Sequence, residues 1–427
     1  KRNTATMICR GNSPIPIPIS EMAPGTLPWL TLDFVEGILR RSEADNSIQV
    51  IDIFVKPATS KGDNYTSDMY RVVAEFSRNQ GDGKTNEKKS VIVKISPTDE
   101  GSRKDLASMI FNTEIFMMSE VLLKMNELLK PENRLSADIY CSQMKEPTFL
   151  MMEDLAVSGF RMADRQAGLD MAHSLLAIQG LAKFHASSVA LCEKEPKYKD
   201  SFKRGMFSSE HPEELRAFFV LGTKTLANEV ANWPGLGKKY ADKIMALSDN
   251  IYLKGIEVVK RKDDEFNVIN HGDSWVNNML FKYNEEGKPC GHIFVDFQMC
   301  TYTSPAMDLH YFLCTSPEDK EDESCMKRLL EEYLHVLTNT MKRLGCKTSP
   351  PSMKELEKYM KERAMYGMIS AFTVLPITMG KKEEAKSLDE ILQKDGSYVN
   401  PSYKGQRYRE LMTKKIPIYD KMGLLEP

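Results

Sequence analysis

Residues 268–278 read V-I-N-H-G-D-S-W-V-N-N, and residues 293–298 read I-F-V-D-F-Q. In the first stretch Asp273 precedes Asn278 by five positions, and in the second Asp296 follows an apolar run. Phosphoryl transfer from ATP needs one carboxylate that accepts the proton of the attacking hydroxyl. It also needs an amide oxygen and a second carboxylate that hold Mg2+. The two stretches therefore predict Asp273 as the catalytic carboxylate and Asn278 and Asp296 as metal ligands.

One more residue, His271, completes the predicted catalytic loop. His271 is expected to support catalysis by orienting the loop through hydrogen bonds. The five-residue spacing from Asp273 selects Asn278 over Asn277 as the metal ligand. One such stretch also fits a plain turn followed by a hairpin, but two stretches in this order favour the kinase interpretation.

A buried ion pair is predicted upstream of this loop. Lys94 ends the alternating run V-I-V-K, and a helical pattern spans residues 105–129. On the apolar seam of that helix, Glu114 fills the gap between Ile110 and Met117 at helical spacing. A carboxylate on a buried stripe is costly unless it is paired, which predicts a Lys94–Glu114 pair. In kinases a strand lysine paired in this way contacts the α- and β-phosphates of ATP.

The remaining nucleotide contacts are predicted from weaker signals. The turn at residues 58–67 contains Gly62, Asn64 and Ser67, whose backbone N–H groups and short polar side chains can cradle phosphate oxygens. An ordinary hairpin turn has the same composition. Glu153 ends the apolar run in F-L-M-M-E-D-L, where the chain is expected to cross between lobes and its backbone to meet adenine. A strand end with solvated acids remains the alternative there.

Hydrophobic periodicity predicts an α+β fold with two lobes, a small β-rich lobe and a larger, mostly helical lobe. A polar hairpin loop is expected at residues 79–89. Strands are expected at residues 48–55, 69–77, 90–95, 138–143 and 148–152. Helices are expected at residues 32–41, 105–129, 169–191, 212–231, 236–262, 322–344, 353–373, 381–392 and 408–422.

Three parts follow from this order of elements. A proline-rich arm is expected at residues 1–34, and a nucleotide-binding lobe with an antiparallel five-stranded sheet and one helix at residues 35–153. A larger, mostly helical lobe for catalysis and substrate binding is expected at residues 154–427.

Composition limits the partners and the compartment. A net charge of −2 gives no electrostatic reason to expect nucleic acid or an acidic membrane surface as partner. No apolar run approaches the about 18 residues of a membrane span, and no protein partner is predicted. The eight cysteines form no C-x-x-C and no zinc-like cluster with histidine. Free thiols of this kind predict a cytoplasmic protein.

Three departures from regulated protein kinases point to a small acceptor molecule. Gly272 stands between His271 and Asp273, where those kinases carry Arg, and Asp296 is followed by Phe-Gln rather than Phe-Gly. No A-P-E follows, and only twelve residues separate Asp296 from Asp308, where the next helix signal lies. This spacing leaves no room for a peptide-docking segment, so a small hydroxylated molecule is the expected acceptor. Asp308 is read either as a buttress of the catalytic loop or as a plain helix-start aspartate.

These motifs together resemble the insect ecdysteroid kinase-like family, which is similar in its wider fold to choline and aminoglycoside kinases. The resemblance covers roughly residues 35–425 and rests on H-G-D-S-W-V-N-N-M-L-F-K-Y, V-D-F-Q, G-D-N-Y-T-S, L-M-M-E-D-L and S-P-A-M-D-L-H-Y-F-L. It implies a two-lobed, protein-kinase-like fold and a kinase that uses ATP and Mg2+ to phosphorylate ecdysteroid hormones or xenobiotics in detoxification. It also implies the roles predicted above for Asp273, Asn278, Asp296 and the Lys94–Glu114 pair.

The acceptor pocket is predicted with the least support. Trp275 is a candidate wall because its flat apolar face suits a sterol ring, although packing beneath the loop explains it equally well. Further candidates share a helical spacing that fits an ordinary core at least as well; they are Tyr302, His310, Tyr311, Tyr366 and Phe372. Two other functions remain open, a hormone- or lipid-binding protein on a degenerate kinase scaffold and a protein kinase.

Overall fold

The computed structural model describes residues 7–9, 27–58, 67–96, 102–131, 134–318, 322–380 and 400–426. The chain forms two compact units. The first comprises Lys1–Leu123 with Ser136–Gly159, and the second comprises Lys124–Leu135 with Phe160–Pro427. The division into an arm and two functional lobes stays a prediction. The predicted helix at residues 381–392 and most of the arm lie outside the described residues.

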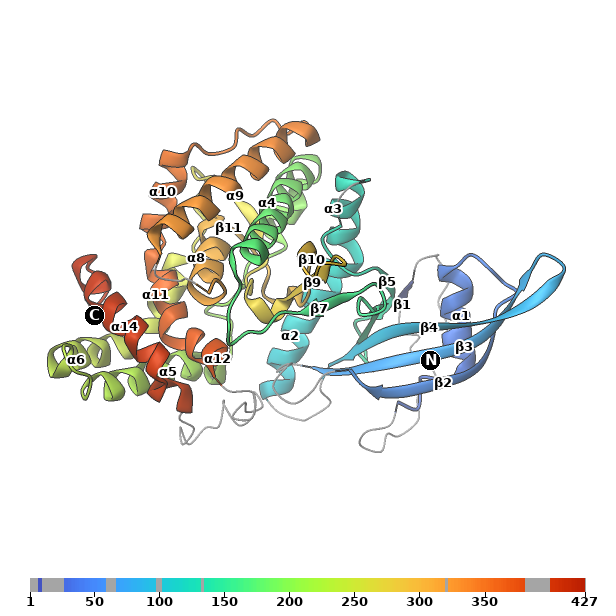
Figure 1. Cartoon of the computed structure of the whole chain (residues 1–427), viewed down its shortest axis with the longest axis horizontal. Helices are drawn as coiled ribbons and strands as arrows, with labels where there is room; N and C mark the ends of the chain where they lie inside the picture. Colours follow the sequence, from blue (N-terminus) through green and yellow to red (C-terminus); the bar gives the residue numbers. More distant parts are fainter. Residues whose placement is uncertain are drawn as a thin grey trace. The chain divides into compact units, whose positions relative to one another are not determined.

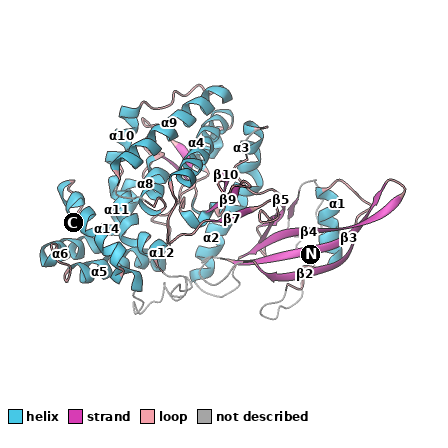
Figure 2. Cartoon of the chain, in the orientation of Figure 1, coloured by secondary structure: helices cyan, strands magenta, loops and turns pink. Residues whose placement is uncertain are grey.

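The first unit is built on one antiparallel sheet, which confirms the predicted α+β class. All five predicted strands are present, and a short strand at the edge of the sheet adds a sixth. The strand order is β1-β5-β6-β4-β3-β2. The strands are β1 (Met7–Cys9), β2 (Gln49–Pro57), β3 (Asp68–Gln80), β4 (Gly83–Ile95), β5 (Ile139–Gln143) and β6 (Phe149–Glu153). Figure 2 shows the strands of this unit in magenta.

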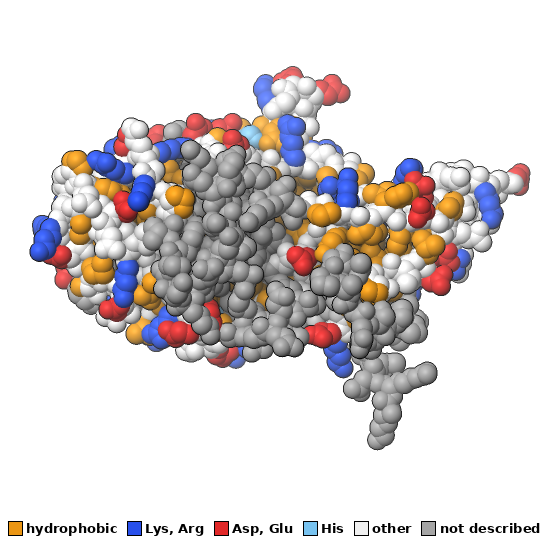
Figure 3. Space-filling view, turned by 90° about the horizontal axis from the view of Figure 1, so that it is seen from below, with side chains coloured by type: hydrophobic (Ala, Val, Ile, Leu, Met, Phe, Trp, Pro, Cys, Tyr) orange, Lys and Arg blue, Asp and Glu red, His pale blue; other side chains and the backbone are white. Residues whose placement is uncertain are grey.

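Alternation along the strands places one face of this sheet on a core. In β3 the buried residues Val72, Ala74 and Phe76 are two positions apart, so they point to the same face. They join a cluster with Trp29 and with the buried residues of helix α1 (Leu32–Ser42), which runs alongside the strands in Figure 1. The edge strand β2 leaves apolar side chains exposed on this unit, as Figure 3 shows in orange.

The predicted hairpin loop at residues 79–89 is wrong. Strands β3 and β4 pair as far as Gln80 and Gly83, and a two-residue turn joins them with Gly81 at a φ of 58°. The outer half of β4 carries mostly exposed polar residues. A strand that is solvated on both faces lacks the apolar–polar alternation by which a sequence reveals strands, so a polar composition was mistaken for a loop.

Helices close the first unit and begin the second. The helix predicted at residues 105–129 is present as three joined segments, α2 (Ser102–Phe116), a π-helical turn (Met117–Val121) and α3 (Leu122–Leu129). Glu114 lies in the last turn of α2, and its carboxylate is buried.

The second unit is mostly helical, as expected, and its helices appear in cyan in Figure 2. Two predicted helices are each broken in two, one at Asp249–Asn250 and one at Arg363. The longer helices are α4 (Met171–Lys194), α5 (Glu213–Val230), α6 (Gly237–Ser248), α7 (Ile251–Val258), α8 (Ala306–Thr315), α9 (Glu323–Leu344), α10 (Met353–Glu362), α11 (Ala364–Thr373) and α14 (Gln406–Lys421). Short helical turns are Pro196–Asp200, Val276–Asn278, Phe297–Met299, α12 (Leu375–Met379) and Pro401–Lys404.

Helix α4 forms the centre of this unit, where it packs against α9. By length and apolar composition it is the one helix of the described chain that could cross a membrane. However, 72% of its apolar window is buried inside the protein. A helix in the core of a protein can have the same length and apolar composition. Helix α4 is buried to the extent expected of such a core helix.

Two small antiparallel sheets carry the candidate site. Strand β8 (Val268–Asn270) pairs with β11 (Thr301–Thr303), and β9 (Met279–Tyr283) pairs with both β7 (Phe160–Met162) and β10 (Pro289–Phe294). The loop that bears Asp273 therefore runs from the end of β8 to the start of β9. Asp296 follows the end of β10.

Candidate active site

The loop after β8 brings together three of the predicted catalytic and metal-binding residues. The side-chain amide of Asn278 donates to Oδ2 of Asp273 at 2.8 Å and to its backbone carbonyl at 2.9 Å. The backbone N–H of Val295 donates to the carbonyl of Asn278 at 3.0 Å. This bond joins the end of the loop to the residue before Asp296, so Asp273, Asn278 and Asp296 share one neighbourhood.

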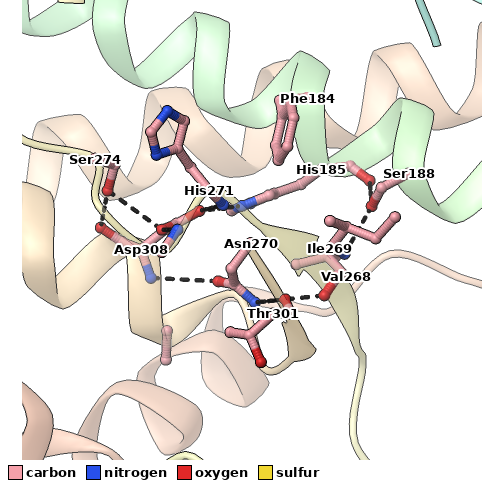
Figure 4. Close-up of polar contacts among 12 residues, drawn as sticks. Phe184, His185, Ser188, Val268, Ile269, Asn270, His271, Ser274, Thr301 and Asp308 are labelled. Atoms are coloured by element: carbon pink, nitrogen blue, oxygen red, sulfur yellow. Dashed lines mark hydrogen bonds and ion pairs between the residues drawn. The ribbon is translucent and has the colours of Figure 1, made fainter. Parts of the chain in front are cut away.

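The carboxylate of Asp308, in the first turn of α8, binds the backbone of the loop that carries Asp273 (Figure 4). Its carboxylate accepts from the N–H of His271 at 2.6 Å and from the N–H of Gly272 at 2.8 Å. It also bonds the side chains of Ser274 at 3.3 Å and His185 at 3.0 Å. Asp308 is fully buried, and the N-cap position of α8 is occupied by Pro305 rather than by Asp308. The structure therefore supports the buttress interpretation of Asp308.

A second set of bonds anchors the strand that leads into the loop. Asn270 accepts from the N–H of Asp308 at 3.3 Å and donates to the carbonyl of Thr303 at 3.1 Å. His185 on α4 contacts Asp308 with one ring nitrogen and the hydroxyl of Tyr333 with the other, at 2.9 Å. His185 is thus a packed, hydrogen-bonded histidine, and the loop rests on side chains from three helices.

His271 orients the loop as a neutral imidazole. Its Nδ1 accepts from the backbone N–H of Asp273 at 3.3 Å, which leaves Nε2 as the donor to the carbonyl of Val295 at 3.1 Å. Burial lowers the pKa of His271, against the nearby charges of Asp308 and Asp296, which raise it. A neutral ring in this tautomer satisfies both contacts.

Gly272 is required by the path of the backbone. Its φ is 81°, and a Cβ at this position would stand 1.8 Å from the carbonyl oxygen of Met299. Only glycine fits this left-handed, crowded site without moving the backbone. The crowded backbone at this position therefore explains why Gly272 stands where regulated protein kinases carry arginine.

Asp273 is held by two donors, one on each carboxylate oxygen. The hydroxyl of Tyr311 donates to Oδ1 at 2.5 Å, and Asn278 donates to Oδ2. Burial raises the pKa of Asp273 to about 7, helped by the charges of Asp296 and Asp308 and opposed by both hydrogen bonds. A carboxylate that titrates near neutral pH suits a group that accepts a proton during catalysis.

The residues predicted to hold a metal ion have the chemistry that Mg2+ prefers. Because Asn278 donates its NH2 group to Asp273, its amide oxygen is the atom left for a metal, and Asp296 adds a carboxylate. Proteins hold Mg2+ through one or two carboxylates and substrate phosphates. Asp296 has a φ of 67°, and among the described residues Ala44 is the only other non-glycine residue with a positive φ. Such strain concentrates at functional sites.

In the first unit, the structure places Lys94 and Glu114 in direct contact. The ammonium group lies 2.7 Å from the carboxylate, and the two residues are 3% and 1% exposed. Lys94 reaches across from β4 to α2, as the seam spacing predicts. Phe111, one turn before Glu114 on the same helix, places its ring centroid 6.0 Å from the ammonium group.

The other predicted nucleotide residues are less well defined. Glu153 ends β6, and its carboxylate accepts from the N–H of Asp138 at 3.2 Å. Ser67 is partly buried just before β3. Gly62 and Asn64 lie outside the described residues.

Sequence reasoning missed a charged cluster beside Glu153. Asp154 is buried and accepts from Nε of Arg71 at 2.6 Å, from its Nη2 at 3.1 Å, and from the hydroxyl of Ser90 at 2.6 Å. These bonds attach the end of β6 to β3 and β4. The adjacent acids in M-E-D-L were the only signal, and they do not reveal which partner comes from a distant strand.

The predicted pocket residues differ in the contacts that they make. Tyr311 reaches Asp273, and its ring centroid lies 6.2 Å from that of Tyr366 on α11. Trp275 follows Asp273 by two positions, and its buried indole N–H has no hydrogen-bond partner.

Three other pocket candidates make contacts of an ordinary core. Tyr302 lies beneath the guanidinium of Arg261, 5.1 Å from ring centroid to charge. A ring nitrogen of His310 bonds the carbonyl of Met360 at 2.7 Å. The ring of Phe372 packs edge-on against that of Tyr419 at 6.0 Å.

No curated protein matches the sequence significantly. Among solved structures, an ethanolamine kinase of Plasmodium vivax is similar at 13% identity and a TM-score of 0.42, over 92% of this chain and 89% of that one. An amicoumacin kinase in complex with AMP-PNP, Ca2+ and its ligand is similar at 13% identity and a TM-score of 0.40, over 84% of this chain and 88% of that one.

A third solved structure, of an aminoglycoside phosphotransferase, is similar at 11% identity and a TM-score of 0.30, over 81% of this chain and 99% of that one. A sequence model of the ecdysteroid kinase-like family matches residues 61–346, which is more than half of the chain. The chain therefore belongs to the ecdysteroid kinase-like family, and it is a phosphotransferase that uses ATP to phosphorylate a hydroxyl group.

Proposed function

We propose that this kinase transfers the γ-phosphate of ATP, with Mg2+, to a hydroxyl group of an ecdysteroid or another steroid-like or xenobiotic compound. The observation that carries the proposal is the double hold on Asp273. Its two carboxylate oxygens each accept one hydrogen bond, from Tyr311 and Asn278. A carboxylate held in this way is oriented before the acceptor arrives, which is the geometric requirement for accepting its proton.

In this proposal the chain supplies three functions to the reaction. Asp273 receives the proton of the acceptor hydroxyl as its oxygen attacks the γ-phosphorus. Lys94, kept in place by Glu114, binds the phosphates of ATP. Asn278 and Asp296 hold Mg2+, which neutralises phosphate charge when it is bound.

The phosphate turn and the adenine contact complete the nucleotide side. Gly62, Asn64 and Ser67 are proposed to cover the phosphates, and the backbone at Glu153 to meet adenine. Both roles are proposed from the sequence signal and the family.

A steroid-like acceptor is supported by the family and by the aromatic residues next to Asp273. Trp275 lies on the loop that carries Asp273, and Tyr366 lies on helix α11. Flat aromatic faces suit a fused apolar ring system. Tyr302, His310 and Phe372 are further candidates for this pocket, proposed from the sequence alone.

The acceptor is identified by incubating the protein with Mg2+-ATP and a panel of ecdysteroids, plant steroids, choline and aminoglycosides. Mass spectrometry would detect the addition of one phosphate. We expect it on an ecdysteroid or another steroid and not on choline or an aminoglycoside. Phosphate on choline alone would reject the proposed acceptor class.

The variant Asp273→Asn tests the catalytic role. Phosphate transfer should fall by at least about a hundredfold, because general-base catalysis supplies about 10²–10⁴-fold. The shift in melting temperature caused by Mg2+-ATP should remain. The variant itself should melt at the same temperature or higher, because the amide removes a buried charge. Unchanged turnover would remove Asp273 from the mechanism.

A scaffold without activity, which binds a hormone or lipid, is the alternative. It predicts that Mg2+-ATP does not raise the melting temperature of the wild-type protein. A cytoplasmic location also remains a proposal, supported by the seven cysteines found as free thiols among the described residues.

A further inference from the structure

Tyr311 makes the shortest contact to the Asp273 carboxylate, with its hydroxyl 2.5 Å from Oδ1. We propose that Tyr311 is a positioning residue for phosphoryl transfer, which holds the Asp273 carboxylate in the orientation that receives the acceptor proton. The inference rests on the proposed role of Asp273. It differs from the pocket wall that the sequence predicts for the same tyrosine.

The helix that carries Tyr311 explains how it reaches Asp273. Asp308 and Tyr311 are three positions apart on α8, so their side chains leave the same face of the helix. Asp308 binds the loop backbone at His271 and Gly272, and Tyr311 binds the side chain of Asp273 one turn later. One rigid helix face therefore sets both the path of the loop and the direction of its carboxylate.

The hydrogen bonds on Asp273 leave room for an acceptor. An ionised carboxylate has about four lone-pair sites. Tyr311 takes one site on Oδ1, and Asn278 takes one site on Oδ2. Rotation of the carboxylate would weaken both bonds, so the remaining lone pairs keep a fixed direction in which to meet a hydroxyl.

The phenol is suited to donate and not to exchange protons. Burial and the adjacent charge of Asp273 raise the pKa of Tyr311 well above its usual value of 10.0. It therefore keeps its proton at neutral pH, and the role of base is left to Asp273.

The surroundings of Tyr311 hold the ring in place. The residue is 3% exposed, and its ring lies beside that of Tyr366. Its backbone carbonyl accepts from the hydroxyl of Thr315 at 2.7 Å within α8. A side chain this enclosed has little surface to offer an acceptor, so its hydroxyl acts mainly through Asp273.

The test compares Tyr311→Phe with the matched control Tyr408→Phe. Tyr408 is also buried, and its hydroxyl donates to the carbonyl of Ala371 at 3.0 Å, away from the loop. Each protein is assayed for Mg2+-ATP hydrolysis with water as acceptor, for phosphorylation of ecdysone, for Mg2+-ATP affinity and for melting temperature. The hydrolysis assay does not depend on knowing the natural acceptor.

We expect Tyr311→Phe to lower kcat by about tenfold to a hundredfold in both reactions, because a displaced catalytic group costs rates of this order. KM for ecdysone and affinity for Mg2+-ATP should stay within about twofold of wild type. The melting temperature should fall no more than in Tyr408→Phe, whose kcat should equal that of wild type. A purely structural role for Tyr311 would change the melting temperature without this loss of kcat.

Two results would overturn the inference while leaving the proposed function intact. One is a kcat for Tyr311→Phe equal to that of the control in an active wild-type background. The other is a raised KM for ecdysone with unchanged kcat, which would make Tyr311 a wall of the acceptor pocket. A wild-type protein with neither activity would instead reject the proposed function, and this inference with it.

Discussion

The two units solve the problem of a buried charge in different ways. In the first unit Lys94 and Glu114 form a pair of opposite charges joined at 2.7 Å. In the second unit the carboxylate of Asp308 is instead surrounded by two backbone amides, a serine and a histidine. Both carboxylates lie in the interior, where an unpaired charge is costly.

This difference teaches how each charge depends on its neighbours. In the Lys94–Glu114 pair, one substitution leaves the other charge without its opposite. A second substitution, at the other residue, can restore neutrality. The Asp308 cluster spreads its charge over many donors from separate parts of the chain. No single replacement can satisfy all of them, so the cluster should tolerate change less well than the pair.

The largest effect is expected for Asp308→Ala. The substitution leaves the amides of His271 and Gly272 without their acceptor and removes the carboxylate partner of His185. We expect a loss of stability at the upper end of about 3–5 kcal/mol, the cost of breaking a buried charged interaction. Chemical denaturation followed by circular dichroism measures it, and ATP hydrolysis should be lost as well.

The matched control is Asp322→Ala. Asp322 is an exposed aspartate at the N-cap of α9, where its carboxylate accepts from the N–H of Ser324 at 2.8 Å. Loss of such a cap costs about 0.5–2 kcal/mol. Equal losses in the two variants would show that Asp308 acts as an ordinary helix-start residue.

The next effect is expected for Lys94→Met, which leaves Glu114 buried without its cation. Stability should fall by about 3–5 kcal/mol, whereas the double variant Lys94→Met with Glu114→Leu should recover most of it, because an apolar pair can replace a buried ion pair at little cost. Both variants should lose ATP hydrolysis. Melting temperature and hydrolysis rate, measured on the same samples, separate the two roles of the pair.

A double variant as unstable as the single one would contradict this account. It would show that Lys94 and Glu114 stabilise the unit through contacts other than their mutual attraction. The Asp308 cluster should offer no comparable rescue by a second substitution at His185.

The smallest effect is a dependence of stability on pH. Burial acts to raise the pKa of Asp308, but the hydrogen bonds from the His185 side chain and the amide of Gly272 hold it below the usual value of 3.8. A carboxyl group with a lowered pKa in the folded state stabilises the protein above its unfolded pKa. That contribution is lost as the pH falls through the folded pKa.

Urea unfolding of wild type and Asp308→Ala between pH 7 and pH 3 measures this contribution. The difference in unfolding free energy between them should be constant from pH 7 to pH 5 and should shrink below about pH 4. A difference that stays constant down to pH 3 would show that the Asp308 charge is not stabilised by the fold.

Much of the first unit could be predicted because its signals are local. Strand alternation located all five predicted strands, and helical spacing identified Glu114 as the partner of Lys94. The same rule failed for residues 79–89, where a strand is exposed on both faces. It also missed the breaks in the helices of the second unit, since amphipathic periodicity continues across a short interruption.

The catalytic loop shows the limit of sequence reasoning. The spacing of His271, Asp273 and Asn278 lies in one short stretch, and the chemistry of phosphoryl transfer assigns their roles. That stretch does not predict Tyr311 as the hydrogen-bond donor to Asp273. It also does not predict whether Asp308 binds the N-terminus of its own helix or the catalytic loop. The contacts of Tyr311 and Asp308 arise when α8 packs against the loop.

The class of fold, the reacting groups and one buried ion pair could thus be predicted from the sequence alone. Each of them depends on periodicity or on spacing within a few turns. Folding in three dimensions decided which distant side chains hold those groups. Hydrogen bonds of about 3 Å between segments far apart in the chain depend on how helices and strands pack, and no short-range pattern encodes that packing.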